Sequence, residues 1–584
     1  MIKPKKFIEE IDFKETCEDK ISWHLKLDNN ENVYGAPDLA HSALKNISKE
    51  ELGFYPNPEK LIDKLSLTYE LNKKNILLTN GAQDALKLCF DAYLEMNDEI
   101  LTYDYEYFDL ILYAKTNGAV IKKIEYDEKF VINSEKIIES ISDKTKILYI
   151  STPDEYTGSI IKPSFIEQIA QKFPNLLIIT DCSYINFDEE TVFEDYIDKA
   201  KKLDNVVIIK SFSKDYALAG LRIAFIAANE NIIKNLKKII LPNNVNSAAI
   251  NCAISALDDK NRINEIKELN SKAKEELHEG LKALGHKPYE SHSNFILCDF
   301  GKYCKYYYEK LKKNGVIVKN FPEDSIFNSC LRIGVPKTSG VKYILELLKV
   351  KDMLIFDVDG VIFDIINSHV VAIAETFKYF TGQEADKSEI LRLKNLGGMS
   401  CDWDVTLHLL KNCGYDVQMS ELISVFQNFF FNPANKIENK KYLIDEEKLL
   451  IPKETFEKIT EKYDLVIFTG RLKDEINYSF NKFGIGKYFY HFVFGDDLPK
   501  NMLKPNPYGI LKILDICPHK SIRYLGCGVD GIIAANMAKI ETIGVVSPDS
   551  DFNSTVNNFK HLCAKYILDD INLIYEFLTD ILPE

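Results

Sequence analysis

Short apolar segments bounded by turn residues recur along the first half of the chain. They stand at 76–79 (ILLT), 146–150 (KILYI), 176–180 (LLIIT) and 206–210 (VVIIK). Because these segments are almost continuously hydrophobic, each fits a strand that is buried on both faces of a sheet. Amphipathic helical stretches lie between most of them. The pattern predicts an α/β fold in which helices cover both faces of a mainly parallel sheet.

A second α/β pattern begins near residue 350. The helical segment VKYILELLKV runs almost directly into MLIFDVDG, a new buried-strand pattern that starts at Met353. We therefore expect two domains, 1–350 and 351–584. A long helical pattern follows Asp364 before strands resume at 465–468 (LVIF). This predicts a helical cap at about 366–450 over the second sheet.

Composition and charge narrow the range of partners. The 584 residues are 46% hydrophobic and 28% charged, which is typical of a globular protein. The net charge of −15 disfavours broad binding to nucleic acid or to an anionic membrane. The twelve cysteines show no C-x-x-C pair, the start MIKPKKFIEEIDFKE lacks a secretory core, and no long apolar stretch offers a membrane span. We expect a cytoplasmic protein that acts on small molecules.

The segment SFSKDYALAGLRIAF, at 211–225, carries a candidate reactive lysine. It follows the predicted strand at 206–210, and ligands of open α/β sheets bind beyond the carboxyl ends of strands. Lys214 can form a Schiff base there, and two hydroxyls and Arg222 are available for a phosphate. Taken alone, S-x-S-K is more often an exposed loop.

Two further strand ends carry polar groups. The strand at 176–180 leads into Asp181, whose carboxylate would be costly to bury without a partner such as a protonated pyridine nitrogen. A helix N-cap or a turn is the alternative interpretation. In NGAQDALKLCF, the residues Gly81, Ala82 and Gln83 fall at a strand-to-helix turn, where free N–H groups favour a phosphate.

In this order, the segments resemble the fold type I aminotransferases and, among them, the histidinol-phosphate aminotransferase family. The resemblance covers roughly residues 20–345. It extends to LDNNENVYG (27–35), GFYPNP (53–58), LPNNVNSAA (241–249), SNFIL (293–297) and CLRIGV (330–335). The resemblance implies pyridoxal 5′-phosphate as the cofactor, an amino-acid donor such as glutamate, and a phosphorylated carbonyl compound as the acceptor.

The resemblance also assigns roles to single residues. Lys214 would hold the cofactor and move a proton, while Asp181 would keep the ring nitrogen protonated. The remaining cofactor contacts would be Tyr184 at the phenolic oxygen, Tyr107 on the ring, and Gly81, Ala82, Gln83, Ser211, Ser213 and Arg222 at the phosphate. The substrate side would hold Tyr34, Asn244, Arg332 and Lys319. Tyr55 would reach the cofactor of a neighbouring subunit, so a homodimer is expected.

Two positions depart from the family pattern. Glu155 stands where the family has an asparagine that donates to the phenolic oxygen, and an ionised carboxylate cannot donate. It must be protonated, turned away or bridged by water. Lys319 replaces a second arginine near the substrate phosphate, which keeps the charge but loses the bidentate geometry. Both changes weaken a strict histidinol-phosphate assignment.

The second half opens with IFDVDGVIFD at 355–364, where two carboxylates follow a buried strand. D-x-D alone is frequently just an acidic turn. Here FTGR (468–471), LKPNPYGI (503–510) and YLGCGVDGIIAANMA (524–538) follow in order. Together, over about 353–550, they resemble the haloacid dehalogenase superfamily of phosphohydrolases with a cap, and they imply a phosphatase.

In that resemblance Asp357 attacks phosphorus, and Asp359 protonates the leaving group and then activates water. Thr469 and Lys504 would neutralise the phosphoryl group. Mg²⁺ would lie among Asp357, the backbone carbonyl of Asp359 and an acidic residue of the last motif. The usual Gly-Asp of that motif is here Gly526-Cys527, which leaves Asp530 as the acid. A thiol is a poor Mg²⁺ ligand, so a weakened metal site is expected.

The segment 393–410 and Arg471 can each be interpreted in two ways. LKNLGGMSCDWDVTLHLL, at 393–410, is either a substrate-specificity loop or a stretch with a core Trp403 and N-cap acids. Arg471 contacts either the substrate or only solvent. The histidines show no ligand spacing and are interpreted as structural.

The two halves together predict a bifunctional enzyme that aminates a phosphorylated carbonyl compound and then removes the phosphate. Imidazole acetol phosphate is the leading candidate acceptor, and dihydroxyacetone phosphate is the second. Two alternatives stay open: a decarboxylase of phosphorylated amino acids in the first half, and a binding module without turnover in the second.

Overall fold

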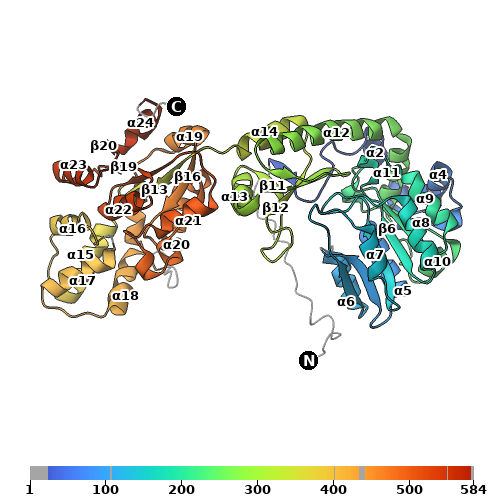
Figure 1. Ribbon diagram of the computed structural model, residues 1–584, viewed down its shortest axis with the longest axis horizontal. Helices are drawn as coiled ribbons and strands as arrows, with labels where there is room; N and C mark the ends of the chain where they lie inside the picture. Colours follow the sequence, from blue (N-terminus) through green and yellow to red (C-terminus); the bar gives the residue numbers. More distant parts are fainter. Residues whose placement is uncertain (1–23, 105–107, 400, 433–440, 549, 581–584) are drawn as a thin grey trace. The chain divides into compact units, whose positions relative to one another are not determined.

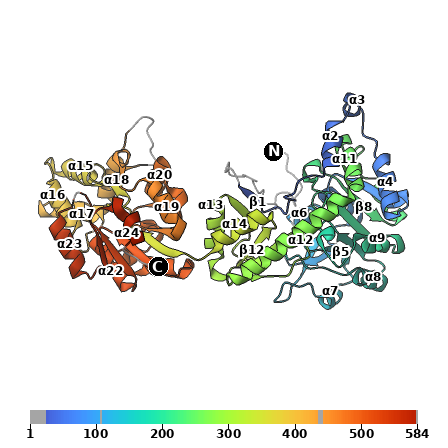
Figure 2. The same cartoon turned by 90° about the horizontal axis from the view of Figure 1, so that it is seen from above.

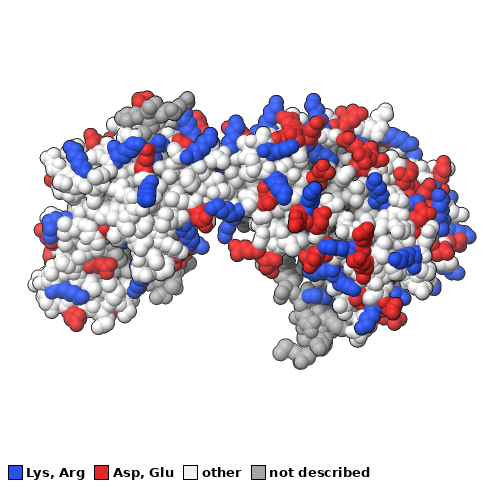
Figure 3. Space-filling view, in the orientation of Figure 1, with Lys and Arg blue, Asp and Glu red and all other residues white. Residues whose placement is uncertain are grey.

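The computed structural model describes residues 24–104, 108–399, 401–432, 441–548 and 550–580. The chain divides into two compact units, Met1–Leu348 and Lys349–Glu584, shown in Figure 1. Within the described residues no helix has both the length and the apolar character needed to cross a membrane. Acidic and basic side chains are interspersed over both units on the face drawn in Figure 3.

The first unit is built around a seven-stranded sheet in which β8 is antiparallel to both of its neighbours and the other pairs are parallel. Its spatial order is β2 (Ile76–Thr79), β8 (Ala224–Ala228), β7 (Val206–Ser211), β6 (Leu177–Asp181), β5 (Thr145–Ser151), β3 (Glu99–Tyr103) and β4 (Val120–Ile124). The mainly parallel sheet expected from the apolar segments is confirmed.

Both faces of this sheet are buried because successive side chains of each strand point to opposite sides. In β5, Leu148 and Ile150 join one apolar cluster, while Ile147 and Tyr149 join the other. The first face is covered by α4 (Glu59–Tyr69), α7 (Ser134–Ser140), α8 (Pro163–Lys172), α9 (Phe193–Lys202) and α11 (Ser247–Asp258). The second face is covered by α5 (Ala82–Tyr93), α6 (Phe108–Thr116) and α10 (Glu230–Leu236).

A smaller five-stranded sheet completes this unit. Its order is β1 (Leu25–Leu27), β11 (Val316–Asn320), β12 (Cys330–Gly334), β10 (Phe295–Asp299) and β9 (Lys287–Pro288). It packs with α12 (Lys260–Ala283), α13 (Cys304–Lys313) and α14 (Thr338–Leu348). The long helix α12 runs across the unit in Figure 2. The short helices α2 (Asp38–Lys45) and α3 (Lys49–Gly53) precede α4, and α2 packs on α11.

The second unit holds a six-stranded, all-parallel sheet. The order is β17 (Phe489–Val493), β16 (Tyr463–Phe468), β13 (Asp352–Phe356), β18 (Ile522–Gly526), β19 (Glu541–Val545) and β20 (Tyr566–Leu568). Its helices are α19 (Lys453–Lys462), α20 (Lys473–Phe483), α21 (Tyr508–Ile516), α22 (Val529–Met537), α23 (Phe552–His561) and α24 (Ile574–Asp580).

The helical cap forms a layer of its own. It consists of α15 (His369–Thr381), α16 (Lys387–Lys394), α17 (Asp402–Asn412) and α18 (Met419–Phe430), which share two apolar clusters. The strand β14 (Phe363–Asp364) precedes the cap in the chain, β15 (Lys448–Leu449) follows it, and the two strands pair antiparallel. Asp357 directly follows β13, and it lines the same cavity as Trp403 and Phe426 of the cap, so it lies between the two layers.

Candidate active sites

The first site lies at the carboxyl ends of β6 and β7, which pair in parallel. Asp181 is the last residue of β6, and Lys214 follows β7 by three residues. The Lys214 Nζ atom donates to the backbone oxygen of Asn29 at 2.7 Å and lies 5.2 Å from the centre of the Tyr184 ring. Burial lowers the pKa of Lys214 to about 8. An amine with this pKa gains and loses protons near neutrality, as a proton carrier requires.

The Asp181 carboxylate is fixed by its own loop. Its Oδ1 atom accepts hydrogen bonds from the Ser183 backbone N–H at 2.9 Å and from the Ser183 hydroxyl at 2.5 Å. Burial raises the pKa of Asp181 above its usual range, although these bonds, Lys210 and Lys214 act against the rise. An oriented carboxylate of this kind suits a cationic ring nitrogen.

A cup for an anion forms where β2 leads into α5. Gly81 is the N-cap of this helix and has φ +87°, and a Cβ atom there would lie 2.6 Å from Nη2 of Arg222. Arg222 in turn donates to the Gln83 side chain at 2.9 Å. Ala82 is the first residue of α5, whose unpaired N–H groups attract an anion. The predicted contacts Ser211 and Ser213 lie at the end of β7, and the Ser213 N–H donates to the Ser211 hydroxyl at 3.0 Å.

Arg332, which was expected on the substrate side, lies in β12 and is 4% exposed. Its two terminal nitrogens donate to the backbone oxygens of Glu155 at 2.8 Å and Asp28 at 2.6 Å. The Nε atom is buried without a hydrogen-bond partner among the described residues. Lys319 pairs directly with Arg332 across β11 and β12. An anionic group of a ligand would satisfy the free Nε donor.

Glu155 does not take over the role of the asparagine that it replaces. The Tyr184 hydroxyl instead accepts from the Asn30 amide at 3.3 Å, and Asn30 is 1% exposed. Burial raises the pKa of Glu155 to about 7, against the opposing effects of Arg332 and Lys214. Asn30 was missed in the sequence analysis, although it lies inside the segment LDNNENVYG that carried the resemblance.

The other predicted residues of this half fall in different places. The Asn244 amide donates to the Leu78 oxygen and to Asp84, both at 3.2 Å, so it lies beside the start of α5. Tyr34 is partly buried, and its backbone oxygen accepts from Arg262 at 3.2 Å. Tyr55 is 86% exposed in the loop between α3 and α4. Tyr107 lies outside the described residues.

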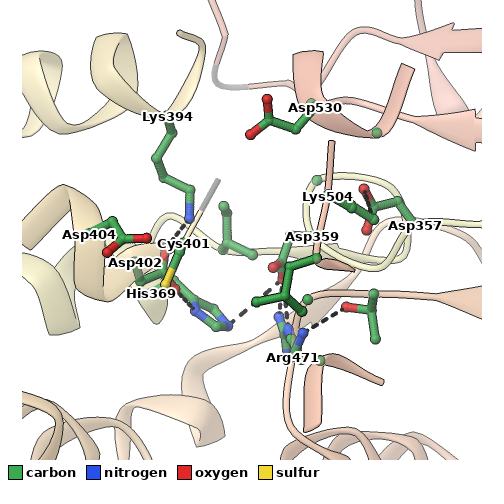
Figure 4. A pocket seen from close by; sticks show the side chains of 18 of the residues that line it. Asp357, Asp359, His369, Lys394, Cys401, Asp402, Asp404, Arg471, Lys504 and Asp530 are labelled. Atoms are coloured by element: carbon green, nitrogen blue, oxygen red, sulfur yellow. Dashed lines mark hydrogen bonds and ion pairs between the residues drawn. The ribbon is translucent and has the colours of Figure 1, made fainter. Parts of the chain in front are cut away.

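The second site surrounds the loop after β13 and lies in a cavity of about 530 Å³ between cap and sheet (Figure 4). Asp357 Oδ2 lies 2.8 Å from Lys504 Nζ and accepts from the Tyr524 hydroxyl at 2.9 Å. Its Oδ1 atom accepts from the Val358 N–H at 2.9 Å. Thr469 lines the same cavity at the end of β16.

Arg471 lines this cavity, and its side chain is 2% exposed, so it does not lie in open solvent. It lies between Asp359 Oδ1, 2.7 Å from its Nε, and Glu447 Oε1, 2.6 Å from its Nη1. Burial raises the pKa of Asp359, but the charges of Arg471 and His369 lower it to about 2 overall. Asp359 is therefore ionised at neutral pH in this arrangement. Sequence reasoning missed Glu447, because nothing in the chain pattern links it to the motif residues.

The cap contributes a charged network to the cavity. Asp402, at the start of α17, accepts from His369 Nδ1 at 2.5 Å and pairs with Lys394. His369 Nε2 lies 3.8 Å from Asp359. Burial lowers the pKa of His369, but Asp359 and Asp402 raise it to about 9 overall. His369 therefore belongs to the site, which corrects its interpretation as purely structural. Trp403 both lines the cavity and packs against the apolar clusters of the cap.

The predicted Mg²⁺ ligands do not come together as a metal site. The Cys527 thiol donates to the backbone oxygen of Asp359 at 2.8 Å. Burial raises the pKa of Cys527 to about 12, so the sulfur keeps its proton. Asp530 Oδ1 accepts from the Gly398 N–H in the cap at 2.8 Å. No group of three or more His, Cys, Asp or Glu side chains within the described ranges is arranged to hold a metal ion. These residues do not fit Mg²⁺.

Comparison with known families agrees with both architectures. Residues 24–348, more than half of the chain, match the model of the aminotransferase class I and II family. The chain belongs to the class I and II aminotransferases. Residues 354–545 match the haloacid dehalogenase-like hydrolase model. The chain is thus an enzyme that fuses an aminotransferase unit to a hydrolase unit, and the predicted fold class is confirmed.

Histidinol-phosphate aminotransferases are among the curated relatives of the aminotransferase unit. A histidinol-phosphate aminotransferase of Thermoanaerobacter sp. (strain X514) is 30% identical over 337 residues, which are 56% of this chain and 93% of the relative. Histidinol-phosphate aminotransferase 2 of Legionella pneumophila (strain Lens) is 29% identical over 320 residues, 54% of this chain and 86% of the relative.

Solved structures show the same fold at lower identity. A histidinol-phosphate aminotransferase from Sinorhizobium meliloti, in complex with pyridoxal-5′-phosphate, superposes with a TM-score of 0.55 at 18% identity. The match covers 60% of this chain and 98% of that one. The enzyme from Clostridium acetobutylicum gives 0.51 at 24% identity, covering 56% of this chain and 98% of that one.

The aminotransferase unit fits pyridoxal phosphate on its own geometry. Gly81 leaves open the space beside Arg222 that a Cβ atom would fill, at the start of a helix. The Nε donor of Arg332 has no hydrogen-bond partner among the described residues and can bind an anion. Lys214 and Asp181 lie at the ends of neighbouring strands. Together they offer an amine for a covalent bond, a carboxylate for the ring and donors for two anionic groups.

Proposed function

We propose that this protein moves an amino group from an amino-acid donor, with glutamate expected, to a phosphorylated ketone or aldehyde, and then removes the phosphate from the product. The supporting observation is that one chain carries both the Lys214–Asp181–Arg332 arrangement and the Asp357–Lys504 arrangement. The two chemistries share a phosphate ester. Amination would come first, because hydrolysis would remove the group that the first site recognises.

In the aminotransferase unit, bound pyridoxal phosphate would supply an electron-accepting ring. Lys214 would carry the proton between the reacting carbons, since its pKa lies near 8. Asp181 would hold the proton of the ring nitrogen, and Asn30 would donate to the Tyr184 hydroxyl that faces the cofactor. Arg332 would orient an anionic group of the substrate through its free Nε.

In the hydrolase unit, Asp357 would attack phosphorus while Lys504 and Thr469 neutralise the phosphoryl oxygens. Asp359 would need a proton to assist the leaving group. In this arrangement Arg471 holds Asp359 ionised, so that role requires the ion pair to open. The same ion pair is the observation that favours the second candidate, a phosphate-ester binding unit without turnover.

The leading acceptor is imidazole acetol phosphate, which would give histidinol phosphate and then histidinol. The relatives' names support this choice. Glu155 and Lys319 depart from the pattern of that family. They keep dihydroxyacetone phosphate, which would give serinol phosphate and then serinol, as the second candidate.

The full chain should be incubated with glutamate and a panel of phosphorylated ketones, and the products should be weighed by mass spectrometry. We expect an amine with phosphate from Asp357→Asn, an amine without phosphate from the wild type, and neither from Lys214→Ala. Release of CO₂ from a phosphorylated amino acid, without any need for an acceptor, would identify a decarboxylase instead. Amination without phosphate release in the wild type would favour the binding unit.

A homodimer is part of the proposal. Tyr55 is 86% exposed, and its neighbours Leu52 and Phe54 are 71% and 74% exposed. An apolar, aromatic stretch of this kind is costly to leave in water. It would be covered by a second copy whose cofactor Tyr55 reaches. Sedimentation at micromolar concentration should give a dimer in the wild type and a weakened one in Phe54→Glu.

A further inference from the structure

We infer that the hydrolase unit works on its phosphate ester without a divalent cation, because the Tyr524 hydroxyl and the Cys527 thiol take the places that a metal ion needs. The inference rests on the proposed function only in assuming a phosphate ester as the ligand. It concerns three contacts, one at each predicted metal ligand.

The first contact occupies Asp357. Its Oδ2 atom already meets the Lys504 ammonium at 2.8 Å and the Tyr524 hydroxyl at 2.9 Å. Lys504 also lies 3.1 Å from the same hydroxyl, so the three groups form a closed set. The charge of this carboxylate is therefore balanced by the protein's own ammonium group.

Two glycines make room for the tyrosine. A Cβ atom at Gly531 would lie 2.1 Å from the Tyr524 hydroxyl, and one at Gly526 would lie 2.5 Å from its ring. Any side chain at these positions, an acid included, would collide with the ring as it stands. The glycines at the end of β18 and in α22 thus belong with a tyrosine that reaches Asp357.

The second contact occupies the backbone oxygen of Asp359. The Cys527 thiol donates to this oxygen at 2.8 Å. A thiol that donates a hydrogen bond offers no negative ligand, and Mg²⁺ prefers hard oxygen ligands. The thiol therefore lies against the backbone oxygen that would face a metal, on the side where a carboxylate ligand is expected.

The third contact draws Asp530 toward the cap. Its Oδ1 atom accepts from the Gly398 N–H at 2.8 Å, and the residue is 3% exposed. Figure 4 shows the Asp530 carboxylate apart from that of Asp357. This acid therefore links α22 to the cap loop, while Lys504 and the buried Arg471 supply the positive charge around Asp357 and Asp359.

The test measures metal binding directly. Mn²⁺, added to the full chain and to Asp357→Asn, is followed by its free-ion electron paramagnetic resonance signal. We expect the free Mn²⁺ signal to be the same with the wild type as with Asp357→Asn, because Asp357 holds no metal ion in either. One equivalent of Mn²⁺ bound by the wild type and lost in Asp357→Asn would overturn the inference.

Two cysteine variants sharpen this result. Cys527→Asp should gain a site that Asp357→Asn removes, because it restores a carboxylate beside the Asp359 oxygen. Cys413→Asp, at an exposed cysteine of the cap, should gain none. A folded Cys527→Asp, judged by its melting temperature, that binds no more Mn²⁺ than the wild type would refute the assignment of the missing ligand to Cys527.

Phosphate release provides an independent readout. With the products of the amination assay, the wild type should release phosphate at equal rates in EDTA and in millimolar Mg²⁺. A rate at least 10-fold higher in Mg²⁺ would overturn the inference. If no phosphate is released in either condition, the proposed hydrolysis fails, and the Mn²⁺ measurement alone decides the metal question.

Discussion

Replacing Arg471 tests whether buried charge holds the hydrolase site together. The Arg471 side chain is 2% exposed, and it neutralises Glu447, which is fully buried, and Asp359, which is 30% exposed. Arg471→Met keeps an elongated side chain but removes the arginine cation from both carboxylates and leaves them with His369 Nε2, which is 3.8 Å from Asp359 and 3.7 Å from Glu447. Removing one partner of a buried ion pair costs about 3–5 kcal/mol. We expect the unfolding free energy of this unit to fall by that amount, mostly through Glu447.

The melting temperature of the unit should fall by about 6–20 °C, since each kcal/mol corresponds to about 2–4 °C in a unit of this size. The chain has two tryptophans, Trp23 and Trp403, and Trp403 lines the same cavity as Arg471. In a Trp23→Phe background, tryptophan fluorescence therefore reports unfolding of the hydrolase unit alone.

The matched control is Arg392→Met, which removes an exposed arginine that pairs with Glu389 in the same unit. The melting temperature of Arg392→Met should equal that of the parent. Asp359 adds a pH signature because its folded pKa, about 2, lies below its ordinary value of 3.8. The stability that ionised Asp359 contributes to the folded unit is present above about pH 4 and is lost as the pH falls toward 2. Equal melting temperatures of Arg471→Met and the parent at pH 7 would refute the reasoning.

Three further substitutions test the aminotransferase unit. In Glu155→Gln, the pH profile of amino transfer should lose an inflection near pH 7, because the wild-type carboxyl is neutral below its raised pKa and charged above it; an unchanged profile would count against the raised pKa. Arg332→Lys should raise the KM for glutamate about 10-fold with a smaller change in kcat, since a lysine lacks the free Nε donor and cannot reproduce the two contacts that orient the guanidinium; a drop in kcat alone would contradict that role. Lys214→Ala should abolish both amino transfer and labelling by borohydride, whereas the control Lys234→Ala, at an exposed lysine, should keep both. Labelling that survives in Lys214→Ala would show that the reactive amine is a different residue.

Much of the fold could be predicted from local patterns. The strands expected at 76–79 and 206–210 are found as β2 and β7, because short, continuous apolar segments between turn residues fit strands that are buried on both faces. The placement of Lys214 and Asp181 at adjacent strand ends follows from the parallel pairing of β6 and β7. Asn30 could not be singled out, because its contact with Tyr184 joins residues 154 positions apart.

The sequence by itself determined the two α/β architectures, the family of the first unit and the residues that bear its chemistry. Only the tertiary structure decided which of these residues meet. It set Glu447 and Asp359 on opposite sides of Arg471, turned Asp530 toward the cap, and placed the Tyr524 hydroxyl on Asp357. The physical reason is that the charge state and the metal affinity of a buried group depend on partners brought in by folding from distant segments, which no local pattern records.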